Sequence, residues 1–278
     1  MIFNQLSSLT TISIEDLKIF PFTVLIYSIY RFIVTSFILK KLSNYVPEKN
    51  RHKFIHRGFD CSHYIISSII GTLAFLQRPY FHCPFYYLDC GKYSECTGEK
   101  LICSNLEKIY FILFASYYMS DILYIKTNNQ IGIMIFHHFV TIGMIFCCVI
   151  VARPVLGLSV MLLHDYGDSF LYLGKVTNYL GLKSQADFLM VSFAISFFYL
   201  RIFGCATIIK LIFTEQLEQP HHKGLYLFAR ILFCGLYCCH IVWGYEIISS
   251  VIKILHGKEI IRDTRSNDGD KKENIKDE

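Results

Sequence analysis

The chain has 278 residues, of which 53% are hydrophobic and only 18% are charged, and its formal net charge is +5. Soluble domains carry about a quarter charged residues, so this composition excludes an ordinary soluble domain. It indicates an all-α polytopic membrane protein. The positive charge is spread over predicted loops and the C-terminal tail, which indicates membrane orientation and no nucleic-acid partner.

The first predicted transmembrane helix covers residues 19–39, since about 20 apolar residues cross a bilayer. Residues 1–18, before it, lack the features of a cleavable signal peptide. Arg31 lies inside the run; either this helix faces protein there, or the arginine snorkels to the membrane surface.

Residues 40–61 are predicted to form a basic cytosolic loop, because cytosolic loops of membrane proteins are rich in Lys and Arg. This segment has few acidic residues. Its six basic residues are Lys40, Lys41, Lys49, Arg51, Lys53 and Arg57. The same rule places the N-terminal residues 1–18 on the lumenal side.

Six further spans are predicted within residues 62–255, which gives about seven transmembrane helices in all. The apolar runs lie near residues 62–76, 106–126, 131–151, 154–176, 186–213 and 226–255. An odd number of crossings from a lumenal N-terminus puts residues 256–278 in the cytosol. This tail holds six basic and seven acidic residues with little that is apolar, so we expect it to be disordered.

A cysteine-rich lumenal loop is predicted over residues 79–105. It contains Cys83, Cys90, Cys96 and Cys103. The lumen is oxidising, so one or two disulfides are expected, and the sequence leaves all three pairings open. A zinc site that includes His82 is the alternative for this loop.

Five ionisable residues interrupt the fourth and fifth predicted spans: His137, His138, His164, Asp165 and Asp168. Such residues are costly in a membrane and mark functional sites. Only two residues join these spans, so they are expected to be antiparallel neighbours. At about 1.5 Å per residue, both groups lie roughly 10 Å below the cytosolic edge. Asp121, in the third span, falls near this level, either within the cluster or in a wet rim.

Four polar residues on the fifth span are spaced by three, four and three and share one helix face: Asp165, Asp168, Tyr172 and Lys175. This face is expected to point into the bundle. On the fourth span, His137 and Thr141 share a face, whereas His138 points about 100° away.

Histidine can act as a general base or as a nucleophile, and a neighbouring carboxylate fixes its tautomer. This pair suits acyl transfer to an amine, which must lose a proton as it attacks. A di-iron site is the rival chemistry, but it needs several H-x-x-H or H-x-x-x-H sets, and only His52 and His56 form one. We therefore expect no metal. The remaining alternative is a set of core histidines bonded to carbonyls, which is how we interpret His240.

The stretch from residue 137 to residue 179 resembles the longevity-assurance motif of the TLC-domain ceramide synthase family, and the likeness extends over residues 30–250. The matching residues are His137, His138, Thr141, Gly157, His164, Asp165, Asp168, Lys175, Asn178 and Tyr179. The chain departs from the pattern at Arg153, which is four residues before Gly157 instead of two, and at Tyr172, where a Glu is common. It also lacks an acidic residue before the histidine pair and a homeobox-like insertion.

The resemblance implies a TLC-type bundle of six helices, residues 62–255, around a central cavity open to the cytosol. It implies a multi-pass protein of the endoplasmic reticulum that joins a fatty acyl group from acyl-CoA to the amine of a sphingoid base. Acyl-CoA is then a substrate, and no cofactor is expected. The bilayer is a further partner, and a homo- or heterodimer is possible.

We assign His137 and His138 as the catalytic pair, oriented by Asp165 and Asp168 with support from His164. Substrate-binding roles are predicted for Thr141, Tyr172, Lys175 and Arg201. Lys175 contacts CoA phosphates or is an ordinary membrane anchor. Arg201 is too deep to snorkel, so a carboxylate or carbonyl partner is expected, with Glu246 as a candidate. The rival functions are a non-catalytic TLC-domain protein and a seven-span receptor or channel.

Overall fold

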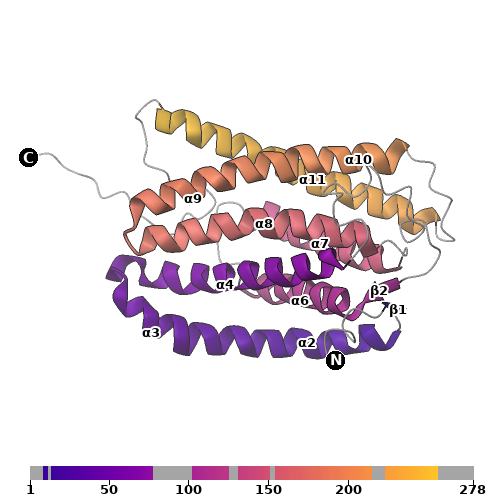
Figure 1. Cartoon of the computed structure of the whole chain (residues 1–278), viewed down its shortest axis with the longest axis horizontal. Coiled ribbons are helices and arrows are strands. Elements are labelled where there is room, and N and C mark those ends of the chain that lie inside the picture. Colours follow the sequence, from indigo (N-terminus) through magenta and orange to yellow (C-terminus); the bar gives the residue numbers. More distant parts are fainter. Residues whose placement is uncertain are drawn as a thin grey trace, which may run out of the picture.

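The computed structural model describes residues 9–11, 14–77, 102–124, 131–150, 154–214 and 223–255. Long helices run side by side along the length of the molecule (Figure 1). In chain order the elements are β1 (Leu9–Thr11), α2 (Ile14–Ile33), η1 (Val34–Leu39), α3 (Lys40–Leu42), η2 (Ser43–Tyr45), α4 (Glu48–Leu76), β2 (Ile102–Ser104), α6 (Asn105–Ile122), α7 (Ile131–Ile150), α8 (Pro154–Tyr179), α9 (Lys183–Ser196), η4 (Phe197–Gly204), α10 (Cys205–Thr214) and α11 (Lys223–Leu255).

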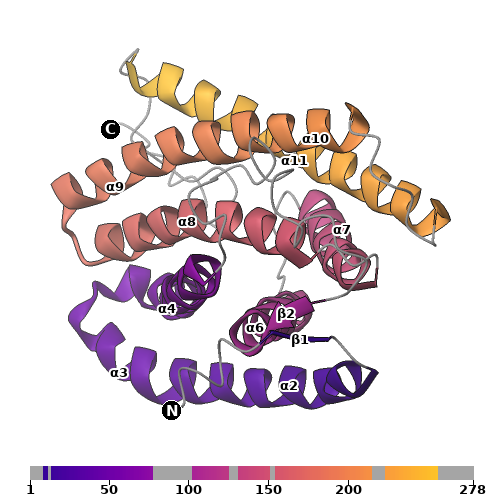
Figure 2. The same ribbon diagram turned by 45° about the vertical axis from the view of Figure 1, so that its right-hand side comes forward.

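Five helical segments are long and apolar enough to cross a membrane: Lys18–Tyr45, Glu48–Leu76, Ile131–Cys148, Lys183–Lys210 and Gly224–Ile252. The two long helices outside this set, α6 and α8, lie inside the bundle, between α2 on one side and α9 to α11 on the other (Figure 2). A helix enclosed by other helices can carry polar groups that would be costly against lipid. The chain is therefore an all-α polytopic membrane protein, as the composition predicts.

The prediction of a loop over residues 40–61 is wrong for most of its length. Helix α4 begins at Glu48, directly after Pro47, whose extended backbone (φ −48°, ψ 137°) ends the preceding turn. Phe54 and Phe59 are buried, at 5% and 0% exposure, while the basic side chains lie mainly on the outer face. An amphipathic continuation of the membrane helix thus has the charge pattern of a cytosolic loop.

Close helix packing in the centre depends on Gly71 of α4. A Cβ at this position would lie 2.6 Å from the Tyr110 ring and 2.7 Å from Leu162, so only glycine fits here. At one end of α8, Gly181 adopts φ +82° in the short turn to α9. This left-handed backbone favours glycine, and it lets the chain reverse within three residues. The turn places α9 antiparallel to α8 (Figure 1).

A two-residue capping arrangement fixes the start of α6. The Ser104 hydroxyl accepts a hydrogen bond from the Glu107 backbone N–H (3.1 Å), and the Glu107 carboxylate accepts one from the Ser104 N–H (2.6 Å). Both residues are buried, and β2 before them pairs antiparallel with β1, Leu9 opposite Ser104. This anchor sets the register of α6, whose other end carries Asp121.

We call the end of the bundle that holds α3, the start of α4 and the end of α8 the basic end, because Lys40, Lys41, Arg57 and Lys175 lie there. Figure 1 shows these three segments together at the left.

Candidate active site

The histidine pair lies on α7, and both side chains are buried, His137 at 5% and His138 at 2% exposure. Their ring planes are 85° apart, with centroids separated by 5.9 Å. Adjacent residues on a helix point about 100° apart, so each histidine meets a different set of neighbours. His138 faces Tyr118 and Asp121 of α6, and His137 faces α8 and α11 as well as Tyr118.

Both ring nitrogens of His138 contact oxygen atoms that only accept hydrogen bonds. Nδ1 lies 2.8 Å from the Met134 carbonyl oxygen, and Nε2 lies 3.2 Å from Oδ2 of Asp121. A carbonyl and a carboxylate have no proton to donate, so both nitrogens carry one. His138 thus has an oxygen partner at each ring nitrogen, and neither nitrogen is open to remove a proton from a substrate.

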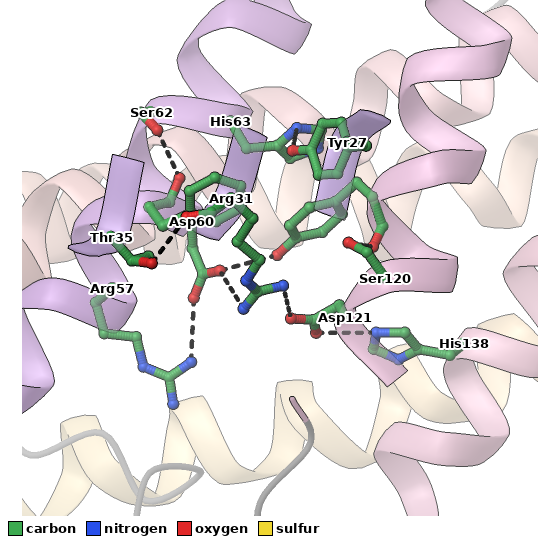
Figure 3. A network of polar contacts seen from close by, with 12 residues as sticks. Tyr27, Arg31, Thr35, Arg57, Asp60, Ser62, His63, Ser120, Asp121 and His138 are labelled. Atoms are coloured by element: carbon green, nitrogen blue, oxygen red, sulfur yellow. Dashed lines mark hydrogen bonds and ion pairs between the residues drawn. The ribbon is translucent and has the colours of Figure 1, made fainter. Parts of the chain in front are cut away.

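A chain of ion pairs extends from His138 to the basic end (Figure 3). Arg31 Nη1 lies 2.8 Å from Oδ1 of Asp121, and its Nη2 lies 3.9 Å from Asp60. Arg57 donates to the second oxygen of Asp60 at 3.3 Å. We call these five residues, Arg31, Arg57, Asp60, Asp121 and His138, the charged network. Asp121 thus joins the cluster, and Arg31, only 4% exposed, faces protein.

His137 points into the centre of the bundle. Its ring centroid is 5.0 Å from Trp243, 5.9 Å from Tyr118 and 6.3 Å from His164. These neighbours come from α11, α6 and α8, so His137 lies where helices distant in sequence converge. The predicted meeting of the histidines of α7 and α8 is present in the structure through His137.

His164 is paired with a histidine that the motif does not contain. Its Nδ1 donates to the Val160 carbonyl (2.7 Å), so in the neutral ring Nε2 is an acceptor. The Nε2 of His240 lies 2.9 Å away and donates that bond. The prediction that His240 is bonded in the core is confirmed, but its partner is a site residue. We call His137, His164 and His240 the histidine cluster.

Arg201 lies in η4, a π-helical segment, a type of distortion that is frequent at functional sites. Its Nη2 is 2.6 Å from Oδ2 of Asp168 and donates to the His164 carbonyl at 2.9 Å. The side chain is 2% exposed. A carboxylate or a carbonyl partner was predicted, and Arg201 has both. The carboxylate is that of Asp168, where the sequence suggested Glu246.

Asp165 is fully buried, and its Oδ2 accepts from Ser67 (2.5 Å) and Tyr110 (2.6 Å), two neutral hydroxyls. Its other oxygen, Oδ1, has no hydrogen-bond partner among the described residues. Asp165 and Asp168 were predicted to orient the histidine pair. In the structure Asp121 is the carboxylate bonded to that pair, because α6, not α8, packs against the side of α7 that carries His138.

Among the other predicted substrate-binding residues, Thr141 lines a cavity of about 20 Å³ together with His164. Its Oγ1 has no hydrogen-bond partner in the described part of the chain. The rest of the lining is apolar and includes Met144, Met161 and Leu236. This cavity is near the site but holds about one water molecule.

Tyr172 and Lys175 lie at the basic end. The Tyr172 ring stacks on Tyr64 with centroids 5.1 Å apart, and Lys175 Nζ lies 4.9 Å from the Tyr172 centroid. Lys175 is only 8% exposed, so its stem is packed between helices. These two residues thus lie near the end of α8 and contact α4 through Tyr64.

Several predictions fall on residues outside the described ranges, including Cys83, Cys90, Cys96, His82 and the tail 256–278. Cys103 is described and lies buried in β2. The disulfides and the disordered tail therefore stay predictions. Among the described residues, no group of three or more His, Cys, Asp or Glu side chains is placed to hold a metal ion.

The model of the TLC domain family matches residues 53–249, which is most of the chain. The chain belongs to the TLC-domain family, as the motif predicts. Similar curated proteins include "Ceramide synthase 1 LOH3" of Arabidopsis thaliana, 22% identical over 91% of this chain and 90% of the relative. "Ceramide synthase 4" of Mus musculus is 32% identical over 47% of this chain and 33% of its own length. "Sphingosine N-acyltransferase lag1" of Schizosaccharomyces pombe is 22% identical over 90% of this chain and 67% of its own length.

Proposed function

We propose that this protein is a ceramide synthase, which transfers a fatty acyl group from acyl-CoA to the amine of a sphingoid base. The observation that carries the proposal is the different environment of the two histidines on α7. His138 contacts the Asp121 carboxylate, while His137 lies beside His164, whose side chain lines the apolar cavity. The relatives named ceramide synthase and sphingosine N-acyltransferase support the same reaction.

In the proposed reaction the amine nitrogen attacks the thioester carbon, a C–N bond forms, and the C–S bond breaks. His137 takes one proton from the nitrogen and passes it to the sulfur of the leaving CoA, or it first accepts the acyl group on its ring. His138 lies beside it, and in its protonated form it stabilises negative charge on the thioester oxygen. On the other side of the site, His240 fixes His164 by a hydrogen bond, and Arg201 fixes Asp168 by an ion pair.

We infer that the acyl chain lies along the seam between α7 and α8, where the cavity beside Thr141 is lined by apolar side chains. The cavity of about 20 Å³ is far too small for a fatty acyl chain, so the seam must widen. Met144 and Met161 are unbranched and adaptable, which suits a wall that moves. Acyl-CoA approaches from the basic end, where Lys175 and Arg57 suit its phosphates.

We place the protein in the endoplasmic reticulum, with the basic end and residues 256–278 in the cytosol and the N-terminus in the lumen. The concentration of Lys and Arg at that end supports this orientation. Cysteine accessibility to a membrane-impermeant reagent, measured at positions 49 and 224 in sealed microsomes, tests it. A dimer is also proposed, and crosslinking in intact membranes addresses it.

The function is tested with full-length protein expressed in a strain that lacks its own ceramide synthases. Labelled sphingoid base and acyl-CoA should give labelled ceramide with the wild type, and His137→Ala should abolish the product. His52→Ala, on the outer face of α4, serves as a control and should leave activity intact. Absence of product from folded wild-type protein, over a panel of acyl chain lengths and bases, favours a non-catalytic TLC-domain protein. Normal activity of His137→Ala overturns the assignment of His137.

A further inference from the structure

We infer that Arg31 of the first helix is a positioning residue of this active site, although it lies outside the TLC domain match at residues 53–249. Arg31 holds one carboxylate oxygen of Asp121, so that the other oxygen stays on His138. The inference rests on the proposed function and extends the site to a helix that the family motif does not include.

The geometry at Asp121 is the first support. Oδ1 accepts from Arg31 at 2.8 Å and Oδ2 accepts from His138 at 3.2 Å. Asp121 is in the last turn of α6, and its side chain is 19% exposed. It is therefore more exposed than the side chain of Arg31 or of His138. A carboxylate at a helix end can rotate, so two opposite contacts are needed to fix it.

Arg31 itself contacts two aromatic rings and two carboxylates. Its guanidinium carbon lies 4.8 Å from the Phe59 ring centroid and 4.1 Å from that of Tyr124. Asp60 is 3.9 Å from Nη2. These contacts restrict the guanidinium, and its planar fork serves two carboxylates at once, which a lysine ammonium does with less precision.

The number of partners at each carboxylate gives a second argument. Asp60 contacts Arg31 and Arg57, and Asp121 contacts Arg31 and His138 (Figure 3). Without Arg31, Asp60 keeps Arg57, but Asp121 keeps only His138. The Asp121 carboxylate would then be held from one side instead of two, so it could rotate. His138 would then lose its fixed orientation beside His137.

The alternative is that Arg31 only fastens α2 to the bundle. An anchor of that kind affects the amount of folded protein but not the turnover of the protein that has folded. A positioning role affects kcat, depends on Asp121, and is partly restored by a residue of the same charge. These differences separate the two roles.

The experiment compares Arg31→Ala, Arg31→Lys and Asp121→Asn with the wild type, in full-length protein whose folded fraction is measured by size exclusion. We expect Arg31→Ala to lower kcat about 10- to 100-fold, the range for side chains that orient a functional group from behind. KM for both substrates should stay near the wild-type value, because the loss is in the transition state. Arg31→Lys should recover part of kcat.

The matched control is Arg230→Ala. Arg230 is a partly buried arginine of α11 that donates to the Ile212 carbonyl (2.7 Å) and stacks on Tyr226 at 4.4 Å. It fastens helices far from the histidines, so its loss should leave the kcat of folded protein unchanged.

Combining Arg31→Ala with Asp121→Asn should lower kcat no further than Asp121→Asn alone, since Arg31 acts through Asp121. Multiplicative losses, or a wild-type kcat in folded Arg31→Ala, overturn the inference. If Arg31→Ala does not fold, Arg31→Lys with and without Asp121→Asn gives the same test. Ceramide formation by the wild type in the same assay separates these outcomes from a failure of the proposed function.

Discussion

The charged network includes His138 and the histidine cluster includes His137, two adjacent residues of α7 that point in different directions. The two groups are built differently. In the charged network, each carboxylate is matched by at least one guanidinium. The histidine cluster consists of a hydrogen-bonded pair, His164 and His240, beside His137. One side is held by opposite charges and the other by hydrogen bonds among neutral rings.

The two sides also differ in how completely their polar atoms are paired. Among the described residues, no buried side-chain nitrogen or oxygen of Arg31, Asp60, Asp121 or His138 lacks a hydrogen-bond partner. On the other side, Thr141 Oγ1 and Asp165 Oδ1 lack one. Buried polar atoms are almost always paired, so an unpaired one needs an explanation, and substrate binding is the explanation we propose for these two. Among the described residues, the charged network is fully paired and the side of the histidine cluster is not.

The largest effect is expected at Arg201, whose ion pair with Asp168 lies on the side of the histidine cluster. Arg201→Met leaves Asp168 buried without its cation, which should destabilise the protein by about 3–5 kcal/mol. The thermal unfolding midpoint in detergent measures this. Arg201→Met combined with Asp168→Asn removes both charges and should recover most of the midpoint but not the activity. Recovery of both would show that the pair has no part in the reaction.

The next effect separates activity from stability at His240. His240→Phe keeps a ring in the core but removes the donor to His164, so His164 can rotate. We expect kcat to fall about 10- to 100-fold, as for other side chains that orient a functional group. His240→Gln can still donate to His164 and should be less impaired. Equal activity of the Phe and Gln variants contradicts this role, and the unfolding midpoints show whether either variant is simply unstable.

Much of the scaffold can be predicted from local patterns. The apolar runs locate the helices, and the spacing on the predicted fourth and fifth spans shows that His137, His138, His164, Asp165 and Asp168 are interior, which the structure confirms. These features follow from the period of a helix and from the cost of charge in a membrane. Neither depends on which helices are neighbours.

The pairings could not be predicted, because they depend on how helices pack. Arg31 and Asp121 are 90 residues apart, and His164 and His240 are 76 apart. Spacing assigns a residue to a face of its own helix but does not identify the helix opposite. A mid-span histidine such as His240 was a signal, yet a solitary histidine has the same pattern when its only role is in the core.

Within the charged network, a substitution at Asp60 shows whether residues beyond Asp121 also set the orientation of His138. Asp60→Asn keeps the shape but weakens the ion pair with Arg31 and the hydrogen bond from Arg57. A hydrogen bond to a charged group contributes about 1.5–3 kcal/mol. We expect a lower unfolding midpoint with only a modest loss of kcat, because Asp121 still holds His138. A loss of kcat as large as that of Asp121→Asn would mean that the whole network, and not Asp121 alone, sets the orientation of His138.

The smallest effect, and the sharpest test of the open side, is expected at Thr141. Thr141→Val has nearly the same shape and removes an unpaired buried hydroxyl, so stability should hold or rise slightly. If that hydroxyl binds a polar atom of the substrate, kcat/KM falls about fivefold, which corresponds to about 1 kcal/mol. Thr141→Ser retains the hydroxyl and should keep kcat/KM close to the wild-type value. An unchanged kcat/KM in the Val variant would exclude the Thr141 hydroxyl from substrate binding and leave Asp165 Oδ1 as the next unpaired buried atom to test.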